Sequence, residues 1–305
     1  MKHKLKITII LLLMFIVTQF IGLYIVNHYS PVKVVSGQVQ NVTAPTLPYG
    51  LETPQIQENR DFIEVFISFI ISFIFAITII LLLTKLNTKF ILKVWFFVVV
   101  ILALSISLNA ILPSIAYTSL IAVIIAIPLS FFKIYGRNFL VHNATELLIY
   151  PGIAAVFVPL LNIYTIIALL ILISLYDMWA VWRVGIMQKM AKYQIDTLGI
   201  FGGFFIPHID DKTKARLKKM PKEKRKGTKV KVNLAILGGG DVVFPIIAAG
   251  VMLKTLGLVP ALFVTGGATL GLCYLFFFGK KKAYPAMPYI TTGIFLAMLL
   301  GWALF

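Results

Sequence analysis

Two aspartates lie inside hydrophobic stretches that are otherwise typical of membrane-spanning segments: Asp177, which follows Tyr176, and Asp241, which follows three consecutive glycines. A carboxylate at bilayer depth costs roughly 2.5–3.5 kcal/mol on insertion scales, so such residues usually face a partner or a wet cavity. Two carboxylates a few ångströms apart cannot both ionise easily, and they share one proton. One can then act as a base toward water while the other acts as an acid toward a carbonyl. The pair therefore indicates aspartic-protease chemistry within a membrane.

The composition is that of a membrane protein. The chain has 305 residues, of which 60% are hydrophobic and 13% are charged, whereas a soluble domain carries about 25% charged residues. The apolar residues form long runs, and a span needs about 20 of them. The formal charge of +17 would favour nucleic acid as a partner of a soluble protein. Here the lysines lie between the apolar runs, as in cytoplasmic loops, so we expect contact with lipid and none with nucleic acid.

The apolar runs predict an all-α, polytopic membrane protein with nine transmembrane helices. Two intervening loops are long. The loop at 27–61 is expected to be flexible, and the loop at 185–231 is strongly basic, with an interfacial helix expected over 186–192 and a lysine-rich stretch over 212–231. The expected spans are 5–26, 62–83, 90–112, 115–132, 144–161, 163–184, 232–253, 258–278 and 284–304.

Lysine and arginine alternate between the loops. They are frequent at the N-terminus, around 85–93, at 133–137, throughout 185–231 and at 280–282, and they are scarce in the other loops. Because cytoplasmic loops gather these residues, the pattern predicts a cytoplasmic N-terminus and an outside C-terminus. We divide the chain into an N-terminal part, 1–143, with the outside loop 27–61, and a catalytic part, 144–305, with the cytoplasmic loop 185–231.

This arrangement predicts that the two aspartates meet at one depth. Asp177 lies six residues before Arg183, about 9 Å from the cytoplasmic end of its span, and Asp241 lies eight residues after Asn233, about 12 Å in from the same side. Consecutive antiparallel helices tend to be neighbours. Glu146 is expected near a span end, in contact with water.

No cofactor or metal is expected. The single cysteine, Cys273, excludes a disulfide within the chain and a Cys-x-x-Cys zinc clip. The four histidines, His142 among them, lack helical ligand spacing and are expected to be solvated or interfacial.

Three glycines precede Asp241, and a proline lies at the start of the last expected span. The glycines Gly238, Gly239 and Gly240 each weaken a helix by about 1 kcal/mol relative to alanine, which allows unwinding or close backbone approach beside Asp241. Small-residue helix packing is the alternative. Pro285, at the start of the last span, exposes backbone groups that protein or cavity water must satisfy, or it simply begins a helix.

Three motifs in this order resemble the presenilin and signal peptide peptidase family over about residues 144–305. They are Tyr176-Asp177 in the sixth span, Gly238-Gly239-Gly240-Asp241 in the seventh and Pro285-Ala286-Met287 at the ninth. The resemblance implies a Gly-x-Gly-Asp intramembrane aspartyl protease of a cell membrane that cuts substrate transmembrane helices. Orientation and modest length resemble a prokaryotic, archaeal presenilin homologue that acts without partner subunits; a homo-oligomer is left open.

The resemblance also implies roles for individual residues. Asp177 and Asp241 would be the catalytic pair. The site-shaping residues would be Tyr176, Gly238, Gly239 and Gly240, and the substrate-binding residues would be Pro285, Ala286 and Met287. Met287 replaces the usual leucine, a change that bears on substrate preference rather than catalysis.

Other functions use the same features. A prepilin peptidase also carries Gly-x-Gly-Asp, but those enzymes often have a cysteine-rich loop. A proton- or cation-coupled transporter would use both aspartates as ion sites, although inverted repeats are not evident. An inactive membrane chaperone is a further alternative.

Overall fold

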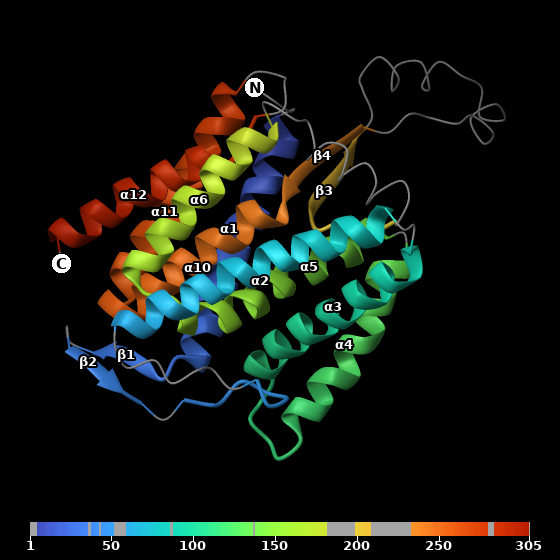
Figure 1. Cartoon of the computed structure of the whole chain (residues 1–305), viewed down its shortest axis with the longest axis horizontal. Helices are drawn as coiled ribbons and strands as arrows, with labels where there is room; N and C mark the ends of the chain where they lie inside the picture. The colour runs from blue at the N-terminus through green and yellow to red at the C-terminus, as the bar shows by residue number, and fades with distance from the viewer. Residues whose placement is uncertain are drawn as a thin grey trace.

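The computed structural model describes residues 5–35, 38–42, 44–51, 59–85, 88–136, 138–181, 199–208, 233–279 and 284–304. Within these ranges the chain forms a helical bundle with two small β-hairpins (Figure 1). The helices are α1 (Leu5–Tyr29), α2 (Asn59–Lys85), α3 (Lys89–Ile111), α4 (Thr118–Tyr135), α5 (Phe139–Phe157), the 3-10 turn η1 (Val158–Leu160), α6 (Ile163–Trp179), α10 (Gly239–Leu256), α11 (Leu258–Phe278) and α12 (Met287–Leu304). The strands are β1 (Val32–Val35), β2 (Gln38–Asn41), β3 (Gly203–His208) and β4 (Asn233–Gly238).

Seven of the described helices are long and apolar enough to cross a membrane, and α6 and α12 are shorter apolar helices. The chain is therefore mostly helical, as the apolar runs predict. The interfacial helix expected over 186–192 and the lysine-rich stretch 212–231 lie outside the described residues.

Helices α1 and α10 form the centre of the bundle. Leu11, Phe15 and Ile25 of α1 are fully buried, as is Ile246 of α10. The two helices pack against each other and both contact α5 and α11. A helix that is apolar on all sides belongs in a core, and here one core joins residues from both ends of the chain.

Glycines bring α11 and α12 into close contact. A Cβ at Gly267 would lie 2.6 Å from the Cβ of Ala297, and a Cβ at Gly271 would lie 2.9 Å from the carbonyl carbon of Tyr289. Small residues of this kind allow membrane helices to pack backbone to backbone. This seam holds the start of α12 at a fixed height in the bundle.

The sequence predicts a flexible loop over 27–61, and this prediction is wrong at residues 32–35 and 38–41. There β1 and β2 pair antiparallel, with Val32 opposite Asn41. Figure 1 places this hairpin at the opposite end of the bundle from β3 and β4. Strand β1 packs against α10, and Val34 contacts Gly257, whose φ of +98° favours glycine in the tight α10–α11 turn.

The expected seventh span, 232–253, is also corrected. Its first six described residues are strand β4, and helix α10 begins only at Gly239. Strand β4 pairs antiparallel with β3, with Phe204 opposite Leu237. The side chains of β4 alternate in burial, with Ala235 and Leu237 buried and Leu234 and Ile236 exposed, which is the period of a strand. This segment is a strand because it pairs with β3, about 30 residues earlier in the chain. Local hydropathy cannot detect pairing over that distance.

Candidate active site

Asp177 lies at the end of α6 that is closest to α12. Helix α6 begins with a capping box between Asn162 and Thr165 and runs without interruption to the last turn, where the Asp177 side chain is buried. One turn before Asp177, the Ser174 hydroxyl donates to Thr291 of α12 at 2.8 Å. The two helices are therefore joined by a polar contact next to the carboxyl group.

The start of α12 supplies backbone donors to this carboxyl group. The Met287 N–H donates to Asp177 Oδ2 at 3.0 Å, and the Ala286 N–H also contacts the carboxylate. Pro285, Ala286 and Met287 are all buried. The first N–H groups of a helix have no partner within the helix and carry partial positive charge. The chain thus directs the N-terminus of α12 at Asp177.

Asp241 lies in the first turn of α10, directly after β4. Gly238 is extended (φ −63°, ψ 146°), and the chain turns into helix at Gly239. A Cβ at Gly238 would lie 3.2 Å from Asp241 Oδ2, so the half-buried carboxyl group folds back over this glycine. A Cβ at Gly239 would lie 2.8 Å from the Tyr150 hydroxyl. Close approach therefore accounts for Gly238 and Gly239.

A glutamine of α1 supports the same turn of α10. The fully buried Gln19 donates its Nε2 to the carbonyl oxygen of Val242 at 3.0 Å. Pro245 has no N–H to donate to the carbonyl group of Asp241 four residues earlier, so this stretch of helix has weaker internal bonding. Gln19 was not among the expected site residues, although a glutamine within an apolar span is a polar signal that could have found it.

The two aspartates come from helices that touch. Helix α6 contacts both α10 and α12, and α10 contacts α12. The depth estimate of 12 Å for Asp241 does not hold, because the residues from Asn233 to Gly238 are extended rather than helical. Tyr176, next to Asp177 in the chain, has a side chain that is 48% exposed, and its ring lies beside Trp179 with 6.3 Å between the ring centroids. Gly240 is exposed.

Two buried ionisable residues, His142 and Glu146, contact the start of β3. The sequence-based expectations for both residues are wrong. Glu146, expected to reach water, is 1% exposed, and His142, expected to be solvated or interfacial, is 7% exposed. Both lie on α5, which packs against β3. The i,i+4 spacing of His142 and Glu146 on one helix face could have signalled a shared partner. In the described part of the chain, no cluster of His, Cys, Asp and Glu is arranged to hold a metal.

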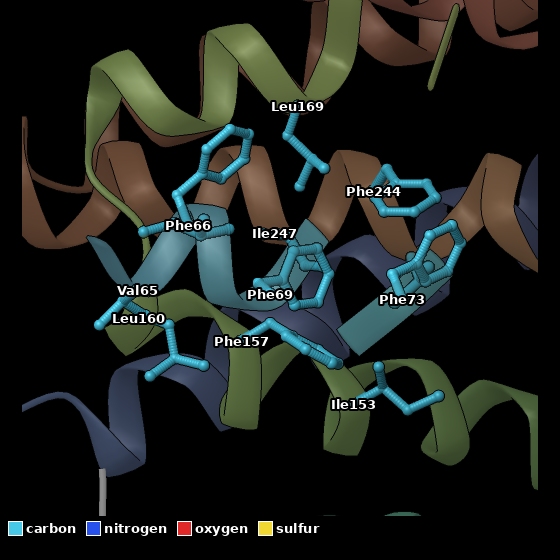
Figure 2. A pocket seen from close by; sticks show the side chains of 12 residues that line it. Val65, Phe66, Phe69, Phe73, Ile153, Phe157, Leu160, Leu169, Phe244 and Ile247 are labelled. Carbon is cyan, nitrogen blue, oxygen red and sulfur yellow. The ribbon is translucent and has the colours of Figure 1, made fainter. Parts of the chain in front are cut away.

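An apolar cavity lies between α2, α5, α6 and α10, close to the first turns of α10. It has a volume of about 130 Å³. Figure 2 shows phenyl rings of α2 directed into it beside Leu169 of α6 and Phe244 of α10. Phe244 lies three residues after Asp241, so one end of the cavity lies near Asp241.

The chain is similar to known proteins both in sequence and in fold. The sequence model of the family described as "Signal-peptide peptidase, presenilin aspartyl protease" matches residues 34–305. Two solved structures of a presenilin family intramembrane aspartate protease, in the C222 and P2 space groups, are similar in fold. The TM-scores are 0.57 and 0.60 at 18% and 20% identity, with 97% of each chain covered in both cases. No curated protein matches the chain.

Proposed function

The chain belongs to the signal-peptide peptidase and presenilin aspartyl protease family, and from this premise we propose that it is an intramembrane aspartyl endopeptidase of the Gly-x-Gly-Asp type. Its substrates are transmembrane helices, cut by peptide hydrolysis. The observation that carries the proposal is that Asp177 and Asp241 lie on touching helices. Asp177 faces the N-terminus of α12 and Asp241 lies in the first turn of α10, and a helix N-terminus can stabilise negative charge. A transporter reading of the same aspartates is not favoured by the family.

The proposed reaction uses the two carboxyl groups and one water. The carboxylate removes a proton from water as the water oxygen bonds to the carbonyl carbon, and the protonated carboxyl group gives its proton to the carbonyl oxygen. When the carbon–nitrogen bond breaks, the departing amine takes a proton back. The Met287 N–H donates to Asp177 Oδ2 and so holds this carboxyl group in place for the reaction.

A substrate helix must unwind before its carbonyl groups can react, and the unwound backbone needs new hydrogen-bond partners. Strand β4 offers them. Ala235 and Leu237 lie opposite Ile206 and Phe204 of β3, and in an antiparallel ladder alternate residues direct their backbone groups to opposite edges. Leu234 and Ile236 therefore present a free edge, a few residues before Asp241, on which an extended substrate can add as a strand.

The apolar cavity is the proposed entry path. Helix α2 forms one wall of the cavity and is the least buried of the seven candidate spans. No described residue in the apolar part of α2 is buried, whereas half of the residues in the apolar part of α1 are buried. A helix held so weakly can move aside with little loss of packing. A substrate helix entering between α2 and α6 would place an apolar side chain in the cavity. We further infer nine spans with a cytoplasmic N-terminus, because the loop charges alternate.

Reconstitution of the full chain with a labelled single-span peptide tests the function. We expect cleavage within the span, inhibition by a peptide that carries a hydroxyl group in place of the scissile carbonyl, and no effect of a metal chelator. Such mimics resemble the tetrahedral intermediate and bind far more tightly than the substrate. Cleavage that a chelator abolishes, or ion transport without cleavage, would contradict the proposal.

A further inference from the structure

A buried ion pair with a histidine lies outside the proposed chemistry. Lys133 of α4 reaches Glu146 of α5, with Nζ and Oε1 2.5 Å apart and both side chains 2% exposed. Lys133 Nζ also lies 3.4 Å from His142 Nδ1. Removing two charges from water costs several kcal/mol per ion, and a buried pair often adds no stability over apolar residues of the same size. Stability alone therefore does not explain this buried ion pair.

The cluster binds the backbone of β3. His142 Nε2 lies 2.9 Å from the carbonyl oxygen of Gly203, and the Gly203 N–H donates to Glu146 Oε1 at 3.3 Å. Since the ammonium group of Lys133 donates to Nδ1, Nε2 carries the proton and donates to Gly203. Both backbone groups of Gly203 are thus satisfied by side chains of α5.

Asn143 repeats the pattern two residues along the strand. The Phe205 N–H donates to Asn143 Oδ1 at 3.1 Å, and Asn143 Nδ2 donates to the carbonyl oxygen of Phe205 at 2.9 Å. Gly203 and Phe205 are the residues whose backbone groups face away from β4. Side chains of α5 therefore take the place of a third strand on this edge of β3.

The opposite edge of β3 is joined to the start of α10. Gly203 is opposite Gly238, and the Gly239 N–H donates to the carbonyl oxygen of Gly202 at 3.2 Å, two residues before Asp241. The face of α5 that carries Glu146 continues to Tyr150, whose ring packs on Phe204 with centroids 5.7 Å apart. One face of α5 thus contacts the hairpin and the turn that leads to Asp241.

We propose that Lys133, His142, Asn143 and Glu146 are positioning residues, which lock β3 to α5 and thereby place Asp241 and the free edge of β4. The charges have a directional role, because Lys133 fixes the orientation of both the carboxylate and the imidazole that hold Gly203. The inference rests on the proposed protease function for its consequence on turnover. The locking of the hairpin itself is independent of that function.

The test compares His142→Phe with His142→Gln in the reconstituted full chain. Phenylalanine keeps an aromatic ring against Phe205, where the ring centroids are 4.6 Å apart, but loses the donor to Gly203, whereas glutamine keeps an N–H at the reach of Nε2. Since a misplacement of about 1 Å can cost about a hundredfold in rate, we expect His142→Phe to lower kcat tenfold to a hundredfold and to raise hydrogen exchange in 203–208 and 233–238. We expect His142→Gln to restore both.

Thr145→Val is the matched control, because the buried Thr145 hydroxyl bonds only to the carbonyl of its own helix, and it should leave kcat and exchange unchanged. Wild-type kcat and hairpin exchange in His142→Phe would overturn the proposal, as would an equal loss in His142→Gln. If His142→Phe does not fold, Asn143→Leu, which removes both bonds to Phe205, is judged by the same two readouts. If the wild type cleaves nothing, the protease function fails, while hairpin exchange still decides whether the cluster locks β3.

Discussion

At the scale of single residues, each candidate carboxyl group lies against backbone at the start of a helix. Asp177 receives the Met287 N–H of α12, and Asp241 folds back over Gly238 in the first turn of α10. Small changes in the backbone near either group should therefore affect chemistry before they affect folding.

Pro285→Ala and Met287→Asp test the contribution of the α12 start. Alanine allows the helix to extend backward and moves the N–H away from Asp177, and a new carboxylate at 287 would repel Asp177. A hydrogen bond to a charged group contributes about 1.5–3 kcal/mol, so kcat should fall roughly tenfold or more in both variants. Thr292→Val, on the exposed side of α12, is the control. Near-wild-type turnover of both variants on a helical substrate would remove this segment from the site.

The sequence identifies Asp177 and Asp241 because deep carboxylates are rare in apolar runs, but it cannot identify their supports equally well. The donor at Met287 is a backbone N–H. Almost every residue type has such a group, so the residue type does not reveal the contact. Glu146 and His142 were expected in water because they lie near a span end, and their burial depends on β3, some 60 residues away in the chain. Contacts of that range are set by the fold and not by the local pattern.

At the scale of elements, the helices follow from the apolar runs, whereas the strands do not. A run of four apolar residues before a glycine is equally compatible with a strand and with the start of a helix, so the sequence alone assigns β4 to the seventh span. The hairpins matter for function, because β4 joins the proposed substrate edge to Asp241. The cavity beside α2 also matters for the proposed function. It is not evident from the local sequence, because side chains of α2, α5, α6 and α10 form it together.

Leu169→Trp tests the cavity as the entry path. The indole ring would occupy space that a substrate side chain needs, so KM should rise several-fold while kcat changes little. Leu172→Trp is the control on the same helix, because Leu172 is 43% exposed and Leu169 only 3%. Unchanged KM in a folded Leu169→Trp protein would mean that substrates reach the aspartates by another route.

At the scale of the whole molecule, helices from both ends of the chain share one core around α1 and α10. This centre fixes the α10 turn through Gln19, while α2 stays at the periphery. Loop charges, rather than packing, predict the direction in which the bundle crosses the membrane. The same charges predict that the basic loop 185–231 lies on the cytoplasmic side.

Cysteine labelling in intact cells tests the orientation. In a Cys273→Ser background, a cysteine at Gln40, which is exposed in β2, should react with an impermeant reagent. A cysteine at Lys219 should react only after the membrane is opened. The reverse pattern would invert the bundle and give the orientation of signal peptide peptidases.

The most direct test of the aspartate pair is turnover of a single-span peptide by Asp177→Asn and Asp241→Asn proteins. Asparagine keeps the shape and most hydrogen bonds of each site but cannot exchange the shared proton. General acid–base catalysis typically contributes about 10²–10⁴-fold, so each variant should lose at least about a hundredfold in kcat, while thermal unfolding and insertion stay as in the wild type. A folded single variant that keeps appreciable turnover would contradict the paired-carboxylate mechanism.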